Sequence, residues 1–147
     1  MVYAKKDPNV LGFLGRALSL EMTAVQQYLT LSRLLQLRGF SEIAQTFQQE
    51  AQEEMTHVER IISRMLVLGV APSATQLRPP VLGDSLPLLV SNTQKFEEEL
   101  VNFYQQAVNY CTHIDDFDNR LFFEKLLQEE KQHAMSLGNW QNELAGN

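Results

Sequence analysis

The chain has 147 residues, of which 44% are hydrophobic, and its formal net charge at pH 7 is −6. This length suits a single domain over residues 1–147, and the acidic balance argues against nucleic acid as a partner. The single cysteine, Cys111, excludes an intrachain disulfide and a CxxC metal site, and no secretory or membrane-spanning segment is recognisable. The chain is therefore expected to be cytoplasmic, with no membrane partner.

Four long segments with helical periodicity follow one another, separated by residues that break helices. The first opens at Asp7-Pro8, an N-cap followed by proline, and stops at Gly39, and the second runs from Ser41 to Gly69. Residues 70–84 contain Pro72, Pro79, Pro80 and Gly83 and have no helical or strand pattern. The third segment begins at Ser85 and runs to about Thr112, a turn covers His113 to Asp116, and the last helix ends near Glu143.

The long middle connection bears on the topology. About 15 extended residues span about 50 Å, whereas a helix of about 27 residues is about 40 Å long. The connection can therefore cross the whole bundle and make the second and third helices parallel. This pattern predicts an all-α, ferritin-like four-helix bundle with one long crossover between helices two and three. An up-down-up-down bundle with a loose loop fits the periodicity equally well.

Each predicted helix carries one glutamate in a row of core positions spaced by seven residues. These glutamates are Glu21, Glu54, Glu97 and Glu130. Burial of an uncompensated carboxylate costs several kcal/mol, so four of them in a core need compensation.

Two helices offer compensation through a Glu-x-x-His motif, Glu54 to His57 and Glu130 to His133. Residues three apart share a helix face, so each carboxylate and imidazole can converge on one ion. One glutamate from each of two helices and Glu-x-x-His from the other two is the ligand set of carboxylate-bridged di-metal bundles. The alternative is that these are solvated charges, which requires both motifs to arise by chance at the same spacing.

The spacing repeats, because Glu54 and Glu130 each stand 33 positions after the preceding core-row glutamate. Tyr28 and Tyr104 each follow a lone glutamate by seven, so the two halves look like copies related by a pseudo-two-fold axis. Helical side chains lean toward the N-terminus, so both hydroxyls are expected near the metal level, where they could hydrogen-bond ligand carboxylates. The alternative is a pair of core tyrosines with unrelated acceptors.

These residues resemble the bacterioferritins, from about Ala4 to Glu143. The resemblance is carried by Leu20-Glu21 with Ala24, Gln27 and Tyr28, by Glu54-Met55-Thr56-His57, and by Leu126 to His133. It implies two iron ions per chain, bridged by Glu54 and Glu130. Glu21 and His57 complete one iron site and Glu97 and His133 the other, and the implied reaction is ferroxidase oxidation of Fe(II) by O2 or H2O2. Carboxylate and imidazole ligands also accept manganese and zinc.

The resemblance also implies a haem b site. Met55 occupies the position at which bacterioferritins supply a methionine from each subunit to a haem at a two-fold dimer interface, and a thioether suits haem iron. The alternative is an interface or surface methionine. A homo-oligomer, at least a dimer, is expected. Only 14 residues follow His133, where bacterioferritins have a fifth helix, so a smaller assembly competes with a 24-subunit cage.

Two other functions remain open. One is a di-iron oxidase or peroxide reductase that acts on a small molecule without forming a cage. The rubrerythrin signature is absent, because Gln94 and Leu100 occupy the positions where a further glutamate would stand. The other is a structural subunit or haem carrier that retains the ligands without catalysis.

Overall fold

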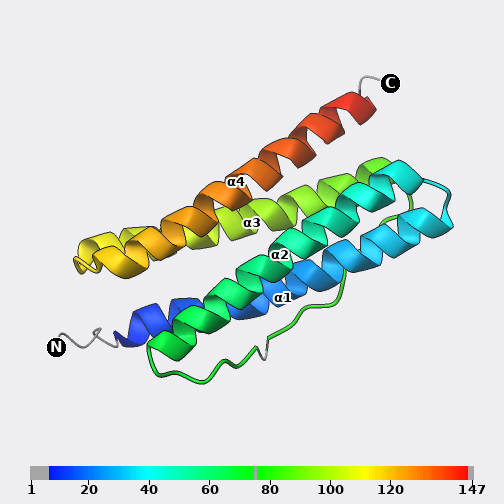
Figure 1. The fold of residues 1–147 in the computed structure, drawn as a ribbon. Coiled ribbons are helices and arrows are strands. Elements are labelled where there is room, and N and C mark those ends of the chain that lie inside the picture. Colours follow the sequence, from blue (N-terminus) through cyan, green and yellow to red (C-terminus); the bar gives the residue numbers. More distant parts are fainter. Residues whose placement is uncertain (1–6, 75, 146–147) are drawn as a thin grey trace. The chain divides into compact units, whose positions relative to one another are not determined.

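The computed structural model describes residues 7–74 and 76–145, which form four α-helices and no strand. Residues 1–6, 75 and 146–147 of the predicted domain lie outside this part. The helices are α1 (Pro8–Leu37), α2 (Ser41–Val67), α3 (Leu86–His113) and α4 (Phe117–Ala145) (Figure 1). None of these described helices combines the length and the hydropathy needed to cross a membrane.

Side-chain caps explain where three of the helices begin. The Asp7 carboxylate accepts hydrogen bonds from the backbone N–H groups of Asn9 and Val10, at 2.9 and 3.1 Å. The Ser85 hydroxyl accepts from the N–H of Leu88 at 3.3 Å, and the Asp116 carboxylate accepts from the N–H of Asn119 at 3.2 Å. Each cap satisfies a donor that a helix leaves open at its start. The predicted starts at Asp7-Pro8 and Ser85 are confirmed.

Three helices end with the same motif, in which the chain reverses through a residue of positive φ. The backbone N–H of Phe40, Val70 and Asp116 donates to the carbonyl five residues earlier, on Leu35, Met65 and Cys111, each at 2.9 Å. The reversing residues are Gly39, Gly69 and Asp115, with φ of 86°, 76° and 58°. Glycine adopts this conformation at the lowest cost, and aspartate is among the other residues that tolerate it.

The predicted turn from His113 to Asp116 was wrong at its first residue. His113 is the last residue of α3, because the chain reverses two residues later at Asp115. No glycine marks this turn, which is why the sequence placed its start too early.

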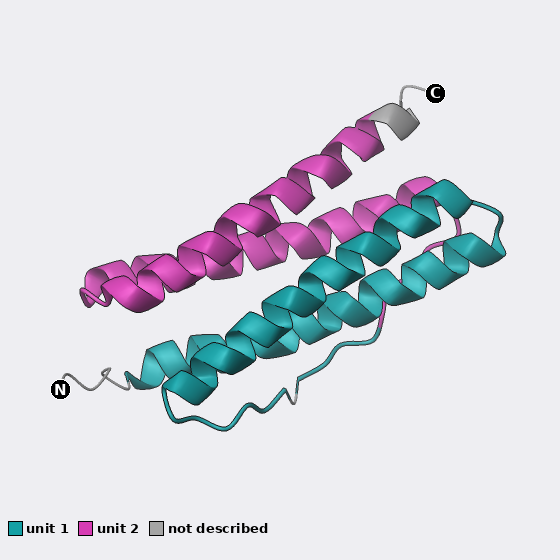
Figure 2. Cartoon of the chain, in the orientation of Figure 1, with its two compact units in different colours: residues 1–79 teal, residues 80–147 magenta. Residues whose placement is uncertain are grey.

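The chain divides into two compact units, residues 1–79 and residues 80–147 (Figure 2). Unit 1 contains the hairpin of α1 and α2, and unit 2 contains the hairpin of α3 and α4, so both predicted helical hairpins are confirmed. The interior of each hairpin is built from aromatic and aliphatic side chains that are almost fully buried. The largest are Tyr28, Phe47, Leu14 and Ile61 in unit 1 and Tyr104, Phe123, Leu100 and Leu126 in unit 2. That the two units form one domain stays a prediction.

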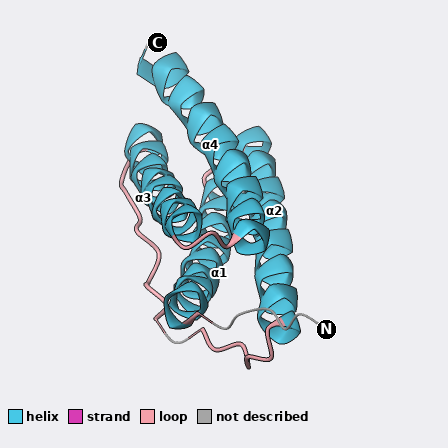
Figure 3. Cartoon of the chain, turned by 90° about the vertical axis from the view of Figure 1, so that its left-hand side faces the viewer, coloured by secondary structure: helices cyan, strands magenta, loops and turns pink. Residues whose placement is uncertain are grey.

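The long connection that follows α2 is bound to α1 within unit 1 (Figure 3). The backbone N–H of Gln76 donates to the Ser19 hydroxyl at 3.5 Å, and that of Arg78 donates to the Thr23 hydroxyl at 3.3 Å. Ser19 and Thr23 lie one turn apart on α1, so the connection runs along this helix. It is anchored there by hydrogen bonds and is not a loose tether.

Candidate metal centre

In unit 1, both helices direct an acidic side chain into the hairpin interior. Glu21 stands on α1 between Leu14 and Tyr28 in the same row, and Glu54 stands on α2 between Phe47 and Ile61. These positions are spaced by seven, so the glutamates share the face that carries the core residues. Both glutamates are fully buried, and His57 is 1% exposed.

The three ionisable side chains of unit 1 converge. Nδ1 of His57 lies 3.4 Å from Oε2 of Glu21 and 3.4 Å from Oε2 of Glu54. One possible ligand atom from each of these residues lies within 4.8 Å of those from the other two. The structure therefore brings together a lone glutamate from one helix and a Glu-x-x-His motif from the next, as the spacing predicts.

Unit 2 repeats the arrangement with α3 and α4. Glu97 and Glu130 are fully buried, and His133 is 7% exposed. Nδ1 of His133 lies 3.4 Å from Oε2 of Glu130, and ligand atoms of Glu97, Glu130 and His133 all lie within 4.8 Å of one another. Each hairpin therefore holds two carboxylates and one imidazole in a buried cluster.

The chemistry of these donors fits a metal ion. Carboxylate oxygens and imidazole nitrogens without thiolates suit iron, manganese and zinc. Two carboxylates per hairpin carry the charge that one divalent cation would neutralise. Burial of a carboxylate without a compensating charge would cost several kcal/mol of folding free energy. A bound metal ion would offset this cost in each cluster.

Aromatic rings lie beside the ligand rows in both hairpins. The Tyr28 ring stacks on Phe47 with the ring centroids 5.8 Å apart, and Tyr104 lies against Phe123 at 6.3 Å. Phe47 and Phe123 stand seven residues before Glu54 and Glu130. Their equal spacing in the sequence was the signal that they occupy equivalent positions in the two hairpins. The expected hydrogen bonds from the tyrosine hydroxyls to ligand carboxylates stay predictions.

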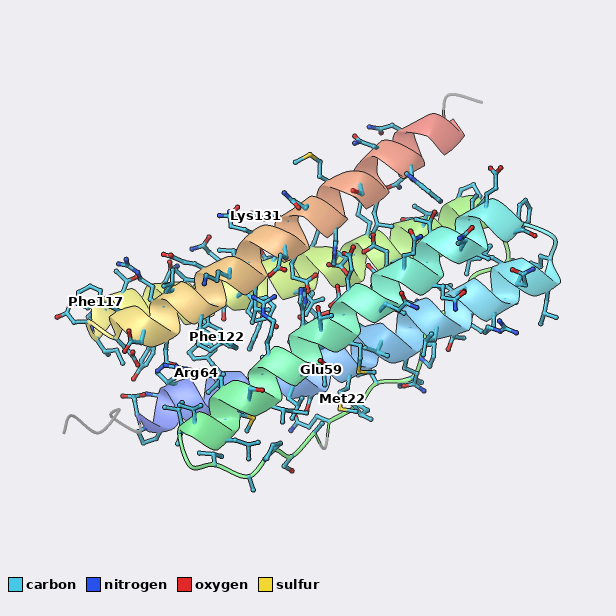
Figure 4. All side chains as sticks on the ribbon, in the orientation of Figure 1. Met22, Glu59, Arg64, Phe117, Phe122 and Lys131 are labelled. Atoms are coloured by element: carbon cyan, nitrogen blue, oxygen red, sulfur yellow. The ribbon has the colours of Figure 1, made fainter. Side chains whose placement is uncertain are left out.

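Met55 follows Glu54 directly but lies on the outer surface of unit 1. Its side chain is 41% exposed, and that of Met22 on α1, labelled in Figure 4, is 37% exposed. This exposure agrees with an interface position, and the haem prediction stays open. Outside the two clusters, His113 is exposed and Cys111 is buried near the end of α3.

Comparison with known proteins places the chain in a family. The family described as Ferritin, the ferritin-like domain, matches residues 12–146. The bacterioferritin of Rhodobacter capsulatus is 32% identical over 130 residues, which are 88% of this chain and 81% of that protein. The chain belongs to the bacterioferritin family. Another bacterioferritin, from Mycolicibacterium paratuberculosis, is 30% identical over 127 residues, 86% of this chain and 80% of that one.

A solved structure extends the likeness to the fold. The Rhodobacter capsulatus bacterioferritin matches with a TM-score of 0.90 and 30% identity, covering 94% of this chain and 86% of that one. That crystal structure is described as having a metal-free dinuclear site and a haem iron in a crystallographic special position. The predicted ferritin-like four-helix bundle with its long crossover is confirmed by this likeness.

Proposed function

We propose that this bacterioferritin-family chain is a di-iron ferroxidase, which oxidises Fe(II) with O2 or H2O2. One observation carries the proposal. Each hairpin holds a fully buried pair of glutamates with a histidine, and both sets have the same spacing in the sequence. Family membership supports an iron-handling protein in general, and the duplicated ligand set points to two metal ions.

Each of the six buried glutamates and histidines has a proposed role in holding iron. Glu21 and His57 would hold one iron, Glu97 and His133 would hold the other, and Glu54 and Glu130 would be shared by both ions, which would make the two hairpins one domain. Four carboxylates neutralise two Fe(II) ions, and burial keeps competing water from the site. The Tyr28 hydroxyl orients a ligand carboxylate, a kind of support that typically changes metal affinity or activity by about 10- to 100-fold.

We also propose a homo-oligomer, at least a dimer, that works in the cytoplasm and binds haem b between copies. Met55 supports the haem because its thioether is available at the surface of unit 1, with Met22 also exposed. The single, buried cysteine suits a reducing compartment. Whether the assembly reaches a 24-subunit cage is decided by its measured mass.

The test is a stopped-flow ferrous-iron titration of the metal-free protein, with particle mass from light scattering on the same sample. Fast oxidation that saturates at about two irons per chain is the expected result, because each hairpin supplies the ligands for one ion. A cage mass with this stoichiometry establishes a storage enzyme. A dimer mass keeps the di-iron centre but moves the function to a small-molecule oxidase or a peroxide reductase.

Metal specificity is tested in parallel by anaerobic titration with Fe(II), Mn(II) and Zn(II). If none of these ions binds at about two per chain, the chain is a structural subunit or a haem carrier and the ferroxidase proposal is wrong.

A further inference from the structure

Two methionines stand directly after the buried glutamates of unit 1, Met22 on α1 and Met55 on α2. Both side chains reach the surface, with exposed fractions of 37% and 41% (Met22 is labelled in Figure 4). We propose that their two sulfur atoms form a binding site for Cu(I) on the outer side of this hairpin. The site lies outside the buried clusters, so it goes beyond the proposed ferroxidase function and does not depend on it.

The direction of each methionine follows from the way in which the two helices meet. The Ser32 hydroxyl of α1 donates to the carbonyl of Ala44 on α2 at 2.9 Å, so these residues mark the sides on which the helices face each other. Met55 stands about three turns after Ala44, so the two lie within about 20° of each other around the helix axis. Met22 lies about 80° around α1 from Ser32, on the side away from Glu21. Both methionines therefore border the contact between α1 and α2 on its outer side.

The two methionines also stand at one level of the hairpin. Nδ1 of His57 lies 3.4 Å from a carboxylate oxygen of Glu21 and 3.4 Å from one of Glu54, so these glutamates are opposite each other. Each methionine is one residue further on, a rise of about 1.5 Å along its helix. Packed helices have axes about 8–10 Å apart, and a methionine side chain has three rotatable bonds. Two thioethers from the facing helices can therefore reach a single ion.

The chemistry of the donors selects the ion. Thioether sulfur is a soft, neutral ligand that favours Cu(I), whereas carboxylate and imidazole suit iron, manganese and zinc. The next turn of each helix supplies Val25 and Val58, which are 9% and 4% exposed and carry no charge. Unit 1 thus separates its donors, with oxygen and nitrogen inside the hairpin and sulfur outside. Binding leaves copper as Cu(I), so no electron is transferred and no further reactant is needed.

Unit 2 lacks the methionine pair although it repeats the buried ligands. The positions equivalent to Met22 and Met55 are Glu98 and Lys131, which are exposed and oppositely charged (Lys131 is labelled in Figure 4). The two methionines are therefore not a by-product of the duplicated ligand spacing.

The alternative role for the pair is a packing surface for another chain, which needs apolar side chains but no sulfur. Substitution by leucine separates the two roles, because leucine keeps the volume and the apolar character of methionine and removes the sulfur atom. A packing surface tolerates this change, whereas a Cu(I) site loses a ligand.

The experiment is an anaerobic titration of the metal-free, haem-free, fully assembled protein with Cu(I) in competition with a coloured Cu(I) chelator. Haem is left out because it would take the same Met55 sulfur. Wild type is compared with Met22→Leu, Met55→Leu and the double variant. Met135→Leu is the matched control, because Met135 is 65% exposed and lies on α4 in unit 2. Light scattering and thermal unfolding check the assembly and the fold of each variant.

We expect wild type and Met135→Leu to bind about one Cu(I) ion per chain with equal affinity, because the pair makes one soft site. Each single variant should weaken binding by more than about 10-fold, since even residues that only support a ligand cost that much. The double variant should bind no Cu(I). Wild-type affinity should stay constant between about pH 5 and pH 8, because a thioether carries no proton, whereas thiol and imidazole ligands must lose theirs.

X-ray absorption at the copper edge identifies the donor atoms directly when the protein is made with selenomethionine. Selenium neighbours of copper are expected in wild type and in Met135→Leu. Binding at Cys111 or at a histidine would instead give sulfur or nitrogen neighbours and no selenium.

The inference is overturned if wild type binds no Cu(I), if copper has no selenium neighbour, or if Met22→Leu binds Cu(I) as tightly as wild type. Equal losses in Met22→Leu and Met135→Leu also contradict it. If Met55→Leu does not fold, Met22→Leu decides, because it removes one of the two sulfur atoms. Iron oxidation is measured separately, and its failure would count against the proposed ferroxidase function alone.

Discussion

The two hairpins of this chain agree in their interiors and differ on their surfaces. Both place a glutamate, a tyrosine, a phenylalanine and a Glu-x-x-His motif at equal spacing, and both bury them. Each unit buries two of its glutamates, but in total residues 1–79 hold eight Lys and Arg against seven Asp and Glu, whereas residues 80–147 hold four against eleven. Met55 follows Glu54 in unit 1, and Lys131 follows the equivalent Glu130 in unit 2.

This contrast separates two kinds of constraint. A buried ligand must be matched in charge and geometry, because a carboxylate left unmatched in the core costs several kcal/mol. An exposed position tolerates most substitutions, so it can diverge and serve different contacts in the two halves. Exchanges between equivalent positions of the hairpins therefore test which features the site requires.

The largest expected effect comes from removing one of the two proposed bridging glutamates, Glu54 or Glu130. Glu54→Ala and Glu130→Ala should each slow iron oxidation by more than about 100-fold, since even residues that only support a ligand cost up to that much. Helicity should stay nearly intact, and the metal-free variants should melt at the wild-type temperature or above, because a buried charge is gone. Stopped-flow absorbance and circular dichroism measure these effects.

The matched control is Glu59→Ala, at an exposed glutamate on the same helix as Glu54, which should keep the wild-type rate. Equal losses in Glu54→Ala and Glu130→Ala support a symmetric centre. A fast rate in Glu130→Ala with a slow one in Glu54→Ala would restrict the metal site to unit 1.

The next effect concerns the aromatic supports, Phe47 and Phe123, which are almost fully buried in their hairpins. Phe47→Ala and Phe123→Ala should each lower the free energy of unfolding by about 3–5 kcal/mol, through lost transfer energy and the cavity that remains. Urea unfolding of the metal-free protein measures the loss. Phe117→Ala, at a residue that is 62% exposed, should change it by less than about 0.5 kcal/mol. A loss confined to one hairpin would contradict their structural equivalence.

Much of this molecule could be predicted from its sequence, and the exceptions have physical reasons. The helix starts at Asp7-Pro8 and Ser85 and the Glu-x-x-His pairs depend on residues a few positions apart, where helical geometry is fixed. The turn after α3 was predicted to start one residue too early, because Asp115, and not a glycine, adopts the positive φ. The anchoring of the connection on α1 links residues 57 and 55 positions apart, and no local pattern encodes such pairs.

A smaller effect is expected at the equivalent helix ends, where Gly39 has φ of 86° and Asp115 has φ of 58°. Asp115→Gly should stabilise the protein by about 0.5–1 kcal/mol, because glycine adopts this conformation without the strain of a side chain. Gly39→Asp should destabilise it by about 1 kcal/mol through the same strain. A Cβ at Gly39 would meet no atom within 4 Å, so no clash contributes to this loss. Thermal and urea unfolding should show opposite signs, and equal signs would contradict the strain argument.

The smallest expected effect separates the anchored helix α1 from α3. Thr23 and Thr93 each donate a hydrogen bond to the carbonyl four residues earlier, both at 2.8 Å, but only the Thr23 hydroxyl also accepts from Arg78 in the connection. Thr23→Val should therefore destabilise the protein by about 0.5–1 kcal/mol more than Thr93→Val, the contribution of one hydrogen bond. Hydrogen exchange should also quicken at the Arg78 amide in Thr23→Val alone. Unchanged exchange there would mean that the connection is held to α1 by its other contacts, among which the Gln76 bond to Ser19 is the next to remove.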